Sequence, residues 1–440
     1  MGLQAHRVQD RTGVWFPADP RTGRPERKVA AIGIRIAQGV SMHGFALNCD
    51  PDLSWFARIV PCGIPDADVT SLSKETGRQV SVEEVVPVVE RQLVGLCDQP
   101  QRDTLAGADI AADERQQALQ QAAQVLADGQ LLGLPTETVY GLAARADDDA
   151  AVAAIFAAKQ RPASHPLIVH VPDLASAAAF VAPDFLEQAP THAASLMQAF
   201  WPGPLTVIMP RRDGMAQAAA GGQDSVGLRC PSHPVAHAVL QLAAALGVKG
   251  VAAPSANTFG RVSPTTAAHV QQEFGDSLTV LDGGACQVGI ESTIIDCTRG
   301  QPVLLRPGII TPEMVEARTG IRVLLPHEAA TRQAAPRASG TLTAHYAPQA
   351  RVVLMPTELL QERAKDGNLP SDVVIWSRTT LPGMAQRVAM PDDAAATAQQ
   401  LFAQLRDFDA QGVREIWVEA VPAHADWAGV ADRLQRAAAA

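Results

Sequence analysis

The sequence predicts an α/β protein with more than one domain, and three observations support this fold class. The chain has 440 residues, of which 47% are hydrophobic, and single cores stop growing well below this length. From Asp113 onward, short apolar strands alternate with helical segments, as they do in α/β domains. Two polar stretches punctuated by Pro and Gly, near residues 99–112 and 334–348, separate three blocks and are typical of linkers.

The first block, residues 1–98, is expected to be a partial α+β fragment. Apolar and β-branched residues are dense between residues 28 and 60, from Val29 to Ile36 and again from Val40 to Leu47. The two runs flank a turn region at Gly39, so we expect paired strands. A linker over residues 99–112 follows this block.

The second block, residues 113–325, opens with a Gln- and Ala-rich helix from Asp113 to about Asp128. An apolar strand from Leu131 to Leu134 and a turn come next. The following helix has three aspartates, residues 147–149, at its start and Lys159 at its end. Charges placed in this way stabilise the helix dipole.

The last block, residues 349–440, follows a linker at residues 326–348 and is expected to be a small α/β domain. Three apolar segments, residues 352–354, 373–376 and 415–418, are predicted strands that surround a predicted helix at residues 394–408. The alanine-rich tail is predicted to be helical, and we assign no chemistry to it.

Bulk composition argues against several classes of protein. A net charge of −10 disfavours a protein that coats nucleic acid, because phosphate binding needs a dense Lys and Arg face. The six cysteines include no C-x-x-C pair, so neither a zinc site nor a disulfide framework is expected. No signal peptide or membrane-spanning apolar run is present in the sequence. We therefore expect a cytoplasmic protein without a metal site of its own.

Two neighbouring segments carry the first candidate site residues. The run L-P-T-E-T-V-Y-G-L, from Leu134 to Leu142, leaves a strand and places two hydroxyls and a carboxylate on a turn, where ligands often bind. In the run A-K-Q-R-P-A-S-H-P-L-I-V-H, Lys159 and Arg161 lie at a helix end, where they could hold a triphosphate. The alternative is that both cations only complement the helix dipole.

Five further segments also place a polar side chain at the end of a short predicted strand, in most cases Ser, Arg or Asn. They are F-W-P-G-P-L-T, S-V-G-L-R-C-P-S-H-P, A-A-P-S-A-N-T-F-G-R-V-S-P-T, G-I-E-S-T-I-I-D and L-L-R-P-G. Arg229 and Arg306 stand in apolar strands, where a guanidinium is costly unless it meets an anion. That anion is either a ligand or an internal Asp or Glu.

Taken together and in this order, these segments resemble the family of threonylcarbamoyl-AMP synthases. The linker and the block after it are similar to the two-domain, Sua5-type form of that family rather than the short, single-domain YrdC form. The resemblance runs from Asp113 to the end of the chain. It implies a YrdC-like curved mixed sheet with helices that enclose a pocket, followed by a small Rossmann-like α/β domain.

The resemblance also implies an activity. Enzymes of this family form L-threonylcarbamoyladenylate and pyrophosphate from L-threonine, bicarbonate or CO2, and ATP, and a tRNA threonylcarbamoyltransferase complex uses the product to modify tRNA. Mg²⁺ is expected to enter with the triphosphate and to need few protein carboxylates. No Walker A sequence is present, so a P-loop is excluded.

The resemblance assigns roles to individual residues. Four residues are expected to contact L-threonine: Thr138, His170, Arg229 and Ser292. Seven are expected to contact ATP: Arg161, His165, Ser225, Ser255, Ser263, Arg306 and Tyr346. Lys159 is the expected phosphate partner and, with Arg161 and Arg229, positions substrates and stabilises charge. His165 stands where asparagine is common. The linker around Ser339, Gly340 and Tyr346 is expected to act as a lid that excludes water.

The first block resembles the C-terminal part of octanoyltransferases of lipoate synthesis, through residues 27–48 and the run R-I-V-P-C-G-I at residues 58–64. The resemblance implies that Cys62 accepts the acyl group and that Lys28 assists it, since an ammonium lowers the pKa of a thiol. The family's larger N-terminal portion does not precede these runs, which suggests a truncated fusion or a start codon placed too late. We therefore expect Cys62 to be a buried small apolar residue in an inactive fragment.

Two other functions compete with the synthase reading. A module that binds double-stranded RNA or assists ribosome assembly would need a stripe of cations or stacking aromatics, yet aromatic residues make up only 4% of the chain. We expect weak or no stable nucleic-acid binding. Octanoyl transfer by the first block would require an acyl-thioester at Cys62.

Overall fold

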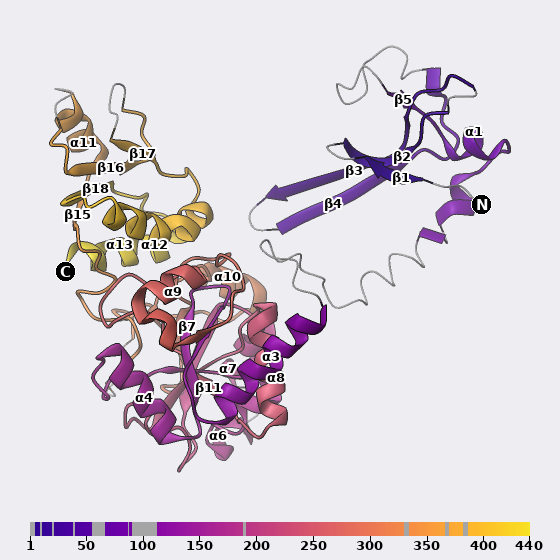
Figure 1. Ribbon diagram of the computed structural model, residues 1–440. Coiled ribbons are helices and arrows are strands. Elements are labelled where there is room, and N and C mark those ends of the chain that lie inside the picture. Colours follow the sequence, from indigo (N-terminus) through magenta and orange to yellow (C-terminus); the bar gives the residue numbers. More distant parts are fainter. Residues whose placement is uncertain are drawn as a thin grey trace. The chain divides into compact units, whose positions relative to one another are not determined.

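The computed structural model describes residues 5–8, 11–19, 22–37, 40–54, 67–86, 88–89, 112–187, 191–329, 334–365, 369–381 and 386–440. The chain divides into two units, residues 1–104 and 105–440 (Figure 1). Each unit packs around its own core.

The described residues of the first unit form a small sheet, followed by short helical segments. Its strands follow the order β1 (His6–Val8), β2 (Arg11–Phe16), β3 (Arg27–Ala37) and β4 (Val40–Leu47), and β5 (Asp68–Val69) pairs with β3. Strands β3 and β4 are antiparallel, so the predicted strand pair is confirmed, and its connection lies outside the described residues. Helix α1 (Leu72–Thr76) begins at the Ser71 cap, whose side chain accepts from the Lys74 amide.

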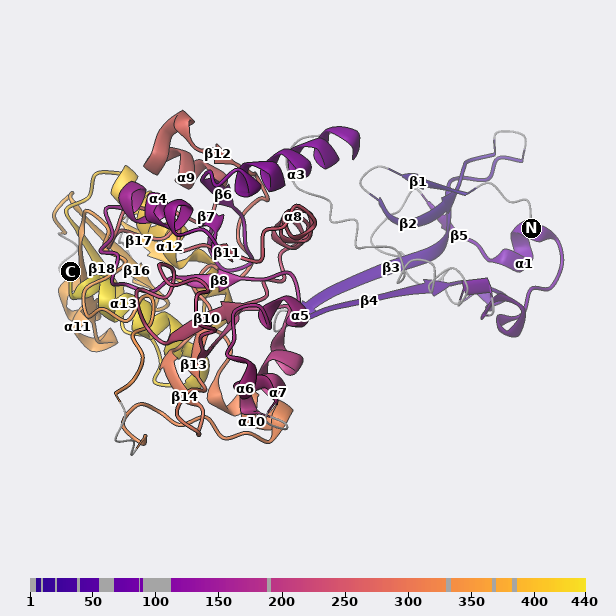
Figure 2. The same ribbon diagram turned by 90° about the horizontal axis from the view of Figure 1, so that it is seen from below.

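A nine-stranded mixed sheet forms the centre of the second unit. Strand β10 is parallel to β8 but antiparallel to β9, and β13 is parallel to β9. Figure 2 shows β6, β7, β11, β8, β10, β13 and β14 following one another. The predicted curved mixed sheet is therefore confirmed. In spatial order the strands are β12 (Thr279–Val280), β6 (Leu132–Leu134), β7 (Gly141–Arg145), β11 (Val251–Ala252), β8 (Ile168–His170), β10 (Ser225–Arg229), β9 (Leu205–Pro210), β13 (Thr293–Asp296) and β14 (Val303–Arg306).

Helices flank this sheet, with α3, α4 and α9 near its β6 end and α6, α7 and α10 near its β14 end (Figure 2). The predicted helix after the three aspartates is α4, and the Asp148 side chain caps it by accepting from two backbone amides. None of the helices in the described part of the chain is long and apolar enough to cross a membrane. The helices are α3 (Ala112–Ala127), α4 (Asp149–Lys159), α5 (Leu174–Ala177), α6 (Pro183–Glu187), α7 (His192–Phe200), α8 (Pro234–Ala245), α9 (Ala267–Phe274) and α10 (Pro312–Thr319).

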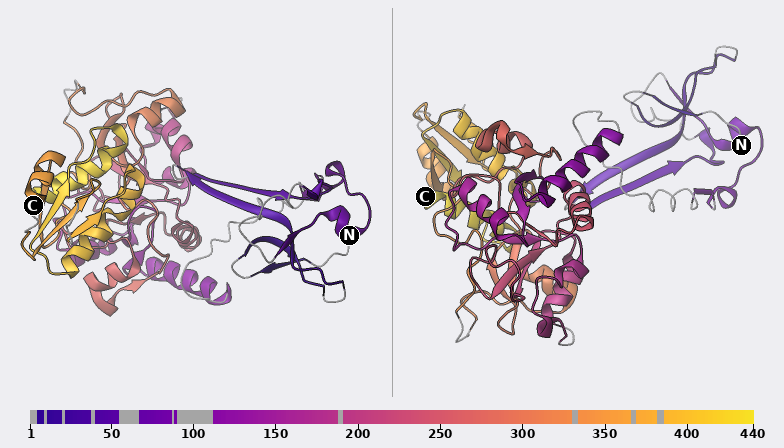
Figure 3. Two further views of the ribbon diagram at one scale, coloured as in Figure 1. Left: turned by 90° about the horizontal axis from the view of Figure 1, so that it is seen from above. Right: turned by 60° about the horizontal axis from the view of Figure 1, so that its bottom comes forward.

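The C-terminal part of this unit, coloured orange to yellow in Figure 3, contains a parallel four-stranded sheet. Its strands follow the order β15 (Arg351–Met355), β18 (Glu415–Glu419), β16 (Val373–Ser377) and β17 (Arg387–Ala389). Helices α11 (Thr357–Ala364), α12 (Ala394–Ala410) and α13 (Ala428–Ala438) complete it. The three predicted strands, the predicted helix and the helical tail are confirmed. Strand β17 and helix α11 were not predicted, because the first is three residues long and the second has a weak apolar stripe.

Helices α12 and α13 lie between this small sheet and the rest of the unit (Figure 1). Ile290 and Tyr346 share one apolar cluster with Phe402 of α12 and Leu434 of α13. Two glycines allow the close approach. A Cβ atom on Gly289 would lie 2.4 Å from the Cα atom of Gln399, and one on Gly429 would lie 2.8 Å from Ile290. The C-terminal part is therefore packed against the larger sheet domain at backbone distance.

Replacing Gly289 with alanine should destabilise the second unit. Gly289 has φ +78°, where an L-residue is strained, and its new Cβ would collide with the backbone of α12. We expect Gly289→Ala to cost about 3 kcal/mol in urea unfolding, the sum of backbone strain and overpacking. Gly300→Ala is the matched control, because Gly300 has φ +84° with no atom within 4 Å of its Cβ position. Equal losses in the two variants would contradict close packing at Gly289.

Candidate active site

Eight of the predicted contact residues line one cavity in the second unit. All four predicted threonine contacts are among them, and four predicted ATP contacts join them. The cavity opens between the ends of the sheet strands and the linker that leads to the C-terminal part. The eight residues are Thr138, His170, Arg229, Ser292, Arg161, Ser255, Arg306 and Tyr346.

Arg229, the last residue of β10, is buried and pairs with an acid of the chain itself. Its Nη2 atom lies 2.7 Å from Oε1 of Glu137, and its Nη1 atom donates to Thr138 Oγ1 at 2.8 Å. Burial acts to raise the pKa of Glu137, but the charge and hydrogen bond of Arg229 outweigh it and hold that pKa below its usual value. The internal anion that the sequence allowed for is therefore Glu137, and it fixes the guanidinium in place.

His170 lies beside Arg229, because the two residues are register partners on the parallel strands β8 and β10. Burial, and then the nearby Arg229 charge, lower the pKa of His170 to about 3. The ring is therefore neutral, and its Nδ1 atom has no hydrogen-bond partner within the described residues. A cation, a hydroxyl and a neutral imidazole thus meet at one end of the cavity. This set suits a ligand with a carboxylate and a hydroxyl.

Arg306, at the end of β14, is also buried but has no carboxylate partner among the residues described. Its Nε atom donates to the Ser292 carbonyl at 3.0 Å, and its Nη2 atom donates to Ser292 Oγ at 3.1 Å. Its Nη1 atom donates to the Ser339 carbonyl of the linker at 2.9 Å. The oxygens that accept its hydrogen bonds in the described residues are all neutral, so an anion that enters the cavity can still pair with it.

Arg161 follows α4 and lies in the wall of the same cavity. Its Nη2 atom donates to the Pro166 carbonyl at 2.9 Å and to Ser339 Oγ at 3.3 Å. Its guanidinium carbon is 5.5 Å from the centroid of the Phe259 ring. Burial lowers the pKa of Arg161 to about 10, so it stays charged at neutral pH. With Arg229 and Arg306 it makes the cavity suited to a polyanion.

The linker crosses this space and divides it. Ser339 and Gly340 line the central cavity; one adjoining hollow shares Ser339 with it, and another shares Gly340. Ser225 lines one hollow and His165 lines the other. Gly340 has φ +73°, and a Cβ there would lie 2.4 Å from the Tyr346 hydroxyl. The linker therefore passes too close to Tyr346 for a larger residue.

Two predicted contacts lie behind the cavity wall instead of lining it. The Lys159 ammonium donates to the Ser255 carbonyl at 2.5 Å and to the Asn257 carbonyl. Burial, and then Arg161, hold the pKa of Lys159 well below its usual value. Ser263 Oγ donates to Glu291 Oε1 at 2.6 Å. In this structure Lys159 supports the loop that carries Ser255, and Ser263 holds a carboxylate of the wall.

Sequence reasoning missed the two acids of the site. Glu137 and Glu291 stand inside the selected runs L-P-T-E-T-V-Y-G-L and G-I-E-S-T-I-I-D, but only hydroxyls and cations were assigned roles there. A buried arginine needs a counter-ion, and this rule could have identified both acids. His345 and Thr206 were also missed; His345 lines the cavity, and Thr206 Oγ1 is hydrogen bonded to Ser292 Oγ at 2.8 Å.

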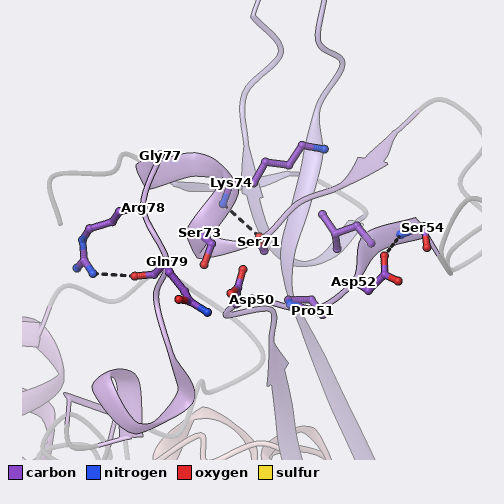
Figure 4. A pocket seen from close by; sticks show the side chains of 11 residues that line it. Asp50, Pro51, Asp52, Ser54, Ser71, Ser73, Lys74, Gly77, Arg78 and Gln79 are labelled. Carbon is purple, nitrogen blue, oxygen red and sulfur yellow. Dashed lines mark hydrogen bonds between the residues drawn. The ribbon is translucent and has the colours of Figure 1, made fainter.

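The first unit has a separate hollow, lined by residues that include Asp50, Ser71 and Arg78 (Figure 4). Neither predicted acyl-transfer residue belongs to it. Lys28 lies on β3, with its ammonium 5.3 Å from the centroid of the Trp15 ring. Cys62 lies outside the described residues.

Three family models match the chain. One described as "Telomere recombination" matches residues 124–308, one described as the C-terminal domain of threonylcarbamoyl-AMP synthase matches residues 310–439, and one described as the lipoyl protein ligase A/B catalytic domain matches residues 1–94. An octanoyltransferase of Salinispora tropica is 61% identical over 97 residues. The match covers 22% of this chain and 45% of that relative, so the chain spans less than half of its length.

The second unit is similar to threonylcarbamoyl-AMP synthases over nearly their full length. The threonylcarbamoyl-AMP synthase of Pyrococcus abyssi is 34% identical over 337 residues, which cover 72% of this chain and 92% of the relative. That of Bacillus subtilis is 34% identical over 332 residues, with the same shares covered. The crystal structure of P. abyssi Sua5 complexed with L-threonine is 34% identical and superposes with a TM-score of 0.63, covering 73% of this chain and 94% of that one.

Removing the charge of Glu137 should destabilise the second unit, because the Arg229 guanidinium would keep its burial and lose its counter-ion. We expect Glu137→Gln to lower the free energy of unfolding by about 3–5 kcal/mol, measured by chemical denaturation. Glu328→Gln breaks an ion pair of equal length, 2.7 Å, to Arg322, whose side chain is 66% exposed. That control should change stability little, and a similar loss in both variants would contradict the role of Glu137.

Stability should fall as the pH drops from 6.5 to 5. Burial lowers the pKa of His170 to about 3 and the pKa of His269 and His345 to about 4. These folded-state pKa values lie below the pKa of about 6.5 that a histidine has in the unfolded chain. In this pH window the unfolded chain therefore binds more protons than the folded protein, and falling pH favours unfolding. Each histidine contributes at most about 1.4 kcal/mol per pH unit.

Thermal melting of wild type, His170→Gln and His345→Gln across this window measures the effect. Each variant should show a shallower loss with falling pH. His424→Gln, at a side chain that is 69% exposed, is the control and should keep the wild-type slope. A wild-type slope in His170→Gln and His345→Gln would show that their rings are not neutral in the folded protein.

Proposed function

The chain belongs to the family of two-domain threonylcarbamoyl-AMP synthases, which are nucleotidyltransferases, and we propose that its central cavity joins L-threonine, bicarbonate or CO2, and ATP. The observation that carries this proposal is the group of buried arginines in one cavity. Arg229 has an internal counter-ion, whereas Arg161 and Arg306 donate hydrogen bonds only to neutral oxygens in the part of the chain described. One end of the cavity is thus set for an amino acid and the rest for phosphates.

In this proposal L-threonine binds at the end of the cavity formed by strands β8 and β10. Arg229 and His170 are adjacent there, and Thr138 accepts from Arg229. The guanidinium would receive the substrate carboxylate, and the neutral imidazole and hydroxyls would receive its polar side chain. The related P. abyssi protein has been crystallised with L-threonine, which supports L-threonine as a ligand of this chain. Ser292, which immediately precedes strand β13, completes the proposed threonine site.

ATP would place its phosphates between Arg306 and Arg161. The carbamate formed on the threonine nitrogen attacks the α-phosphorus with one oxygen, a new P–O bond forms, and the bond to the bridging oxygen breaks to release pyrophosphate. This in-line displacement needs neutralised charge and aligned groups more than it needs a strong base. Ser255 from the central cavity, with Ser225 and His165 from the adjoining hollows, would contact the nucleotide.

Mg²⁺ would enter with the triphosphate. Both carboxylates of the cavity region, Glu137 and Glu291, are already paired with arginines. Within the described ranges no group of three or more His, Cys, Asp and Glu side chains could hold a metal ion. The ion would therefore be held by phosphate oxygens and water, as is common for Mg²⁺ bound with a nucleotide.

The linker would act as a lid over the reacting groups. Ser339 accepts from Arg306 with its carbonyl oxygen and from Arg161 with its hydroxyl. Gly340 and Tyr346 of the same segment line the cavity. A mixed anhydride is hydrolysed readily, so a covered cavity protects the product. The adenylate would then pass to a tRNA threonylcarbamoyltransferase complex.

The structure gives no reason to prefer an RNA-binding module. Such a module exposes its cations, whereas Arg229 is 4% exposed and Arg306 is 2% exposed. No activity is proposed for the first unit.

Purified protein given ATP, Mg²⁺, bicarbonate and L-threonine should release pyrophosphate in a threonine-dependent manner. Arg229→Ala should reduce this rate by roughly a hundredfold, because it truncates a buried charged group that contacts the substrate. Arg322→Ala, on an exposed ion pair of the same domain, is the control and should leave the rate unchanged.

Arg229→Ala also leaves Glu137 without a partner, so its folding is checked by thermal melting. The double variant Glu137→Gln with Arg229→Gln supplies a neutral pair and should be equally inactive. Release without threonine, or none in wild type, would refute the proposed function.

A further inference from the structure

One arginine of the C-terminal part has its whole side chain inside the unit. Arg433 of α13 is 0% exposed, and its Nε atom donates to Glu291 Oε2 at 2.9 Å. Its Nη2 atom donates to the Glu291 carbonyl at 3.2 Å, and its Nη1 atom donates to the Pro307 carbonyl and to Asp432 Oδ2, each at 2.7 Å. Its guanidinium carbon lies 5.4 Å from the centroid of the Tyr346 ring. Arg433 therefore reaches from the C-terminal part to the segments that carry Ser292 and Arg306.

The position of Arg433 is set by close helix packing. Gly429 is one helical turn before Arg433 on the same face of α13. A Cβ on Gly429 would lie 3.1 Å from the Gly308 backbone and 2.8 Å from Ile290. The helix can approach the catalytic sheet only because of this glycine, and the approach brings the Arg433 guanidinium to Glu291.

Glu291 is the only carboxylate that lines the central cavity among the described residues. Its two oxygens are occupied, one by Ser263 at 2.6 Å and the other by Arg433. Burial acts to raise its pKa, but Arg433 first and Arg306 next outweigh this and hold the pKa below its usual value. Glu291 is therefore charged, and two arginines compete for that charge.

The contacts show how the competition is settled. Arg433 makes the ion pair with Glu291, and within the described residues Arg306 donates only to oxygens of Ser292 and Ser339. A carboxylate that paired with Arg306 would cancel its charge and add a negative group to the phosphate end of the cavity. Arg433, from the C-terminal part, thus supplies the counter-ion of Glu291.

We propose that Arg433 is a positioning residue of the nucleotide site, which holds the charge of Glu291 so that Arg306 stays free for a phosphate of ATP. This inference rests on the proposed function. It makes the C-terminal part a contributor to substrate binding as well as an attachment point for the lid.

The test measures KM for ATP and kcat in threonine-dependent pyrophosphate release. Arg433→Gln should raise KM for ATP roughly tenfold, because Glu291 would then engage Arg306 and repel the triphosphate. Adding Glu291→Gln removes that charge, so the double variant should bind ATP more tightly than Arg433→Gln alone and recover most of the loss. A role limited to holding the domains together predicts no such rescue.

Arg406→Gln is the matched control for domain attachment. Arg406 of α12 also bridges the two parts, with its Nη2 atom 2.9 Å from Glu273 Oε1, but neither residue lines the cavity. It should lower the melting temperature without raising KM for ATP. Arg414→Gln, which breaks an exposed pair with Asp372, should leave activity unchanged.

Several outcomes would overturn the inference. They are an unchanged KM for ATP in Arg433→Gln, an equal increase in Arg406→Gln, or a double variant no better than the single one. If Arg433→Gln does not fold, Arg433→Lys replaces it, because it keeps the charge but loses the bonds to the two carbonyls. A tenfold higher KM in a folded Arg433→Lys would then refute the charge argument. Failure of the proposed function is separate, since wild type would release no pyrophosphate with threonine.

Discussion

Burial of guanidinium groups is the constraint on which this site depends. Arg161, Arg229 and Arg306 are each less than a tenth exposed and line one cavity. A cation taken out of water is costly unless it is paired or hydrogen bonded. The chain meets this cost in two ways, with a carboxylate for Arg229 and with neutral oxygens for the other two. The second arrangement is less stable on its own, and it leaves positive charge that an incoming polyanion can neutralise.

The same constraint explains why the site needs both parts of the second unit. Ser339 of the linker supplies the carbonyl that Arg306 uses and the hydroxyl that Arg161 uses. Helix α13 supplies Arg433, which pairs with the carboxylate of the wall. Without these groups, Arg306, Arg161 and Glu291 would each lose one of their partners. The linker and the C-terminal part therefore take part in the electrostatics of the site and do not merely cover it.

The fold was predictable where short-range signals were strong. Helix α4 has an aspartate cap and a lysine at its end, and both signals lie within the helix itself. Strand β17 and helix α11 were missed because both are short, and β17 is fixed instead by its pairing with β16. The strand order β11, β8, β10 could not be read from the chain either. It depends on pairing between segments that are distant in sequence.

The sequence by itself determined the fold class, the family and most residues of the cavity. It could do so because each motif is a short run of neighbouring residues, and the runs follow one another along the chain in a characteristic order. Only the tertiary structure decided the partner of each charge. Arg229 meets Glu137 and Arg433 meets Glu291 across gaps of many residues, while Lys159 turns to loop carbonyls and Ser263 to a carboxylate. Electrostatic interactions depend on distance in space, and that distance exists only once the chain has folded.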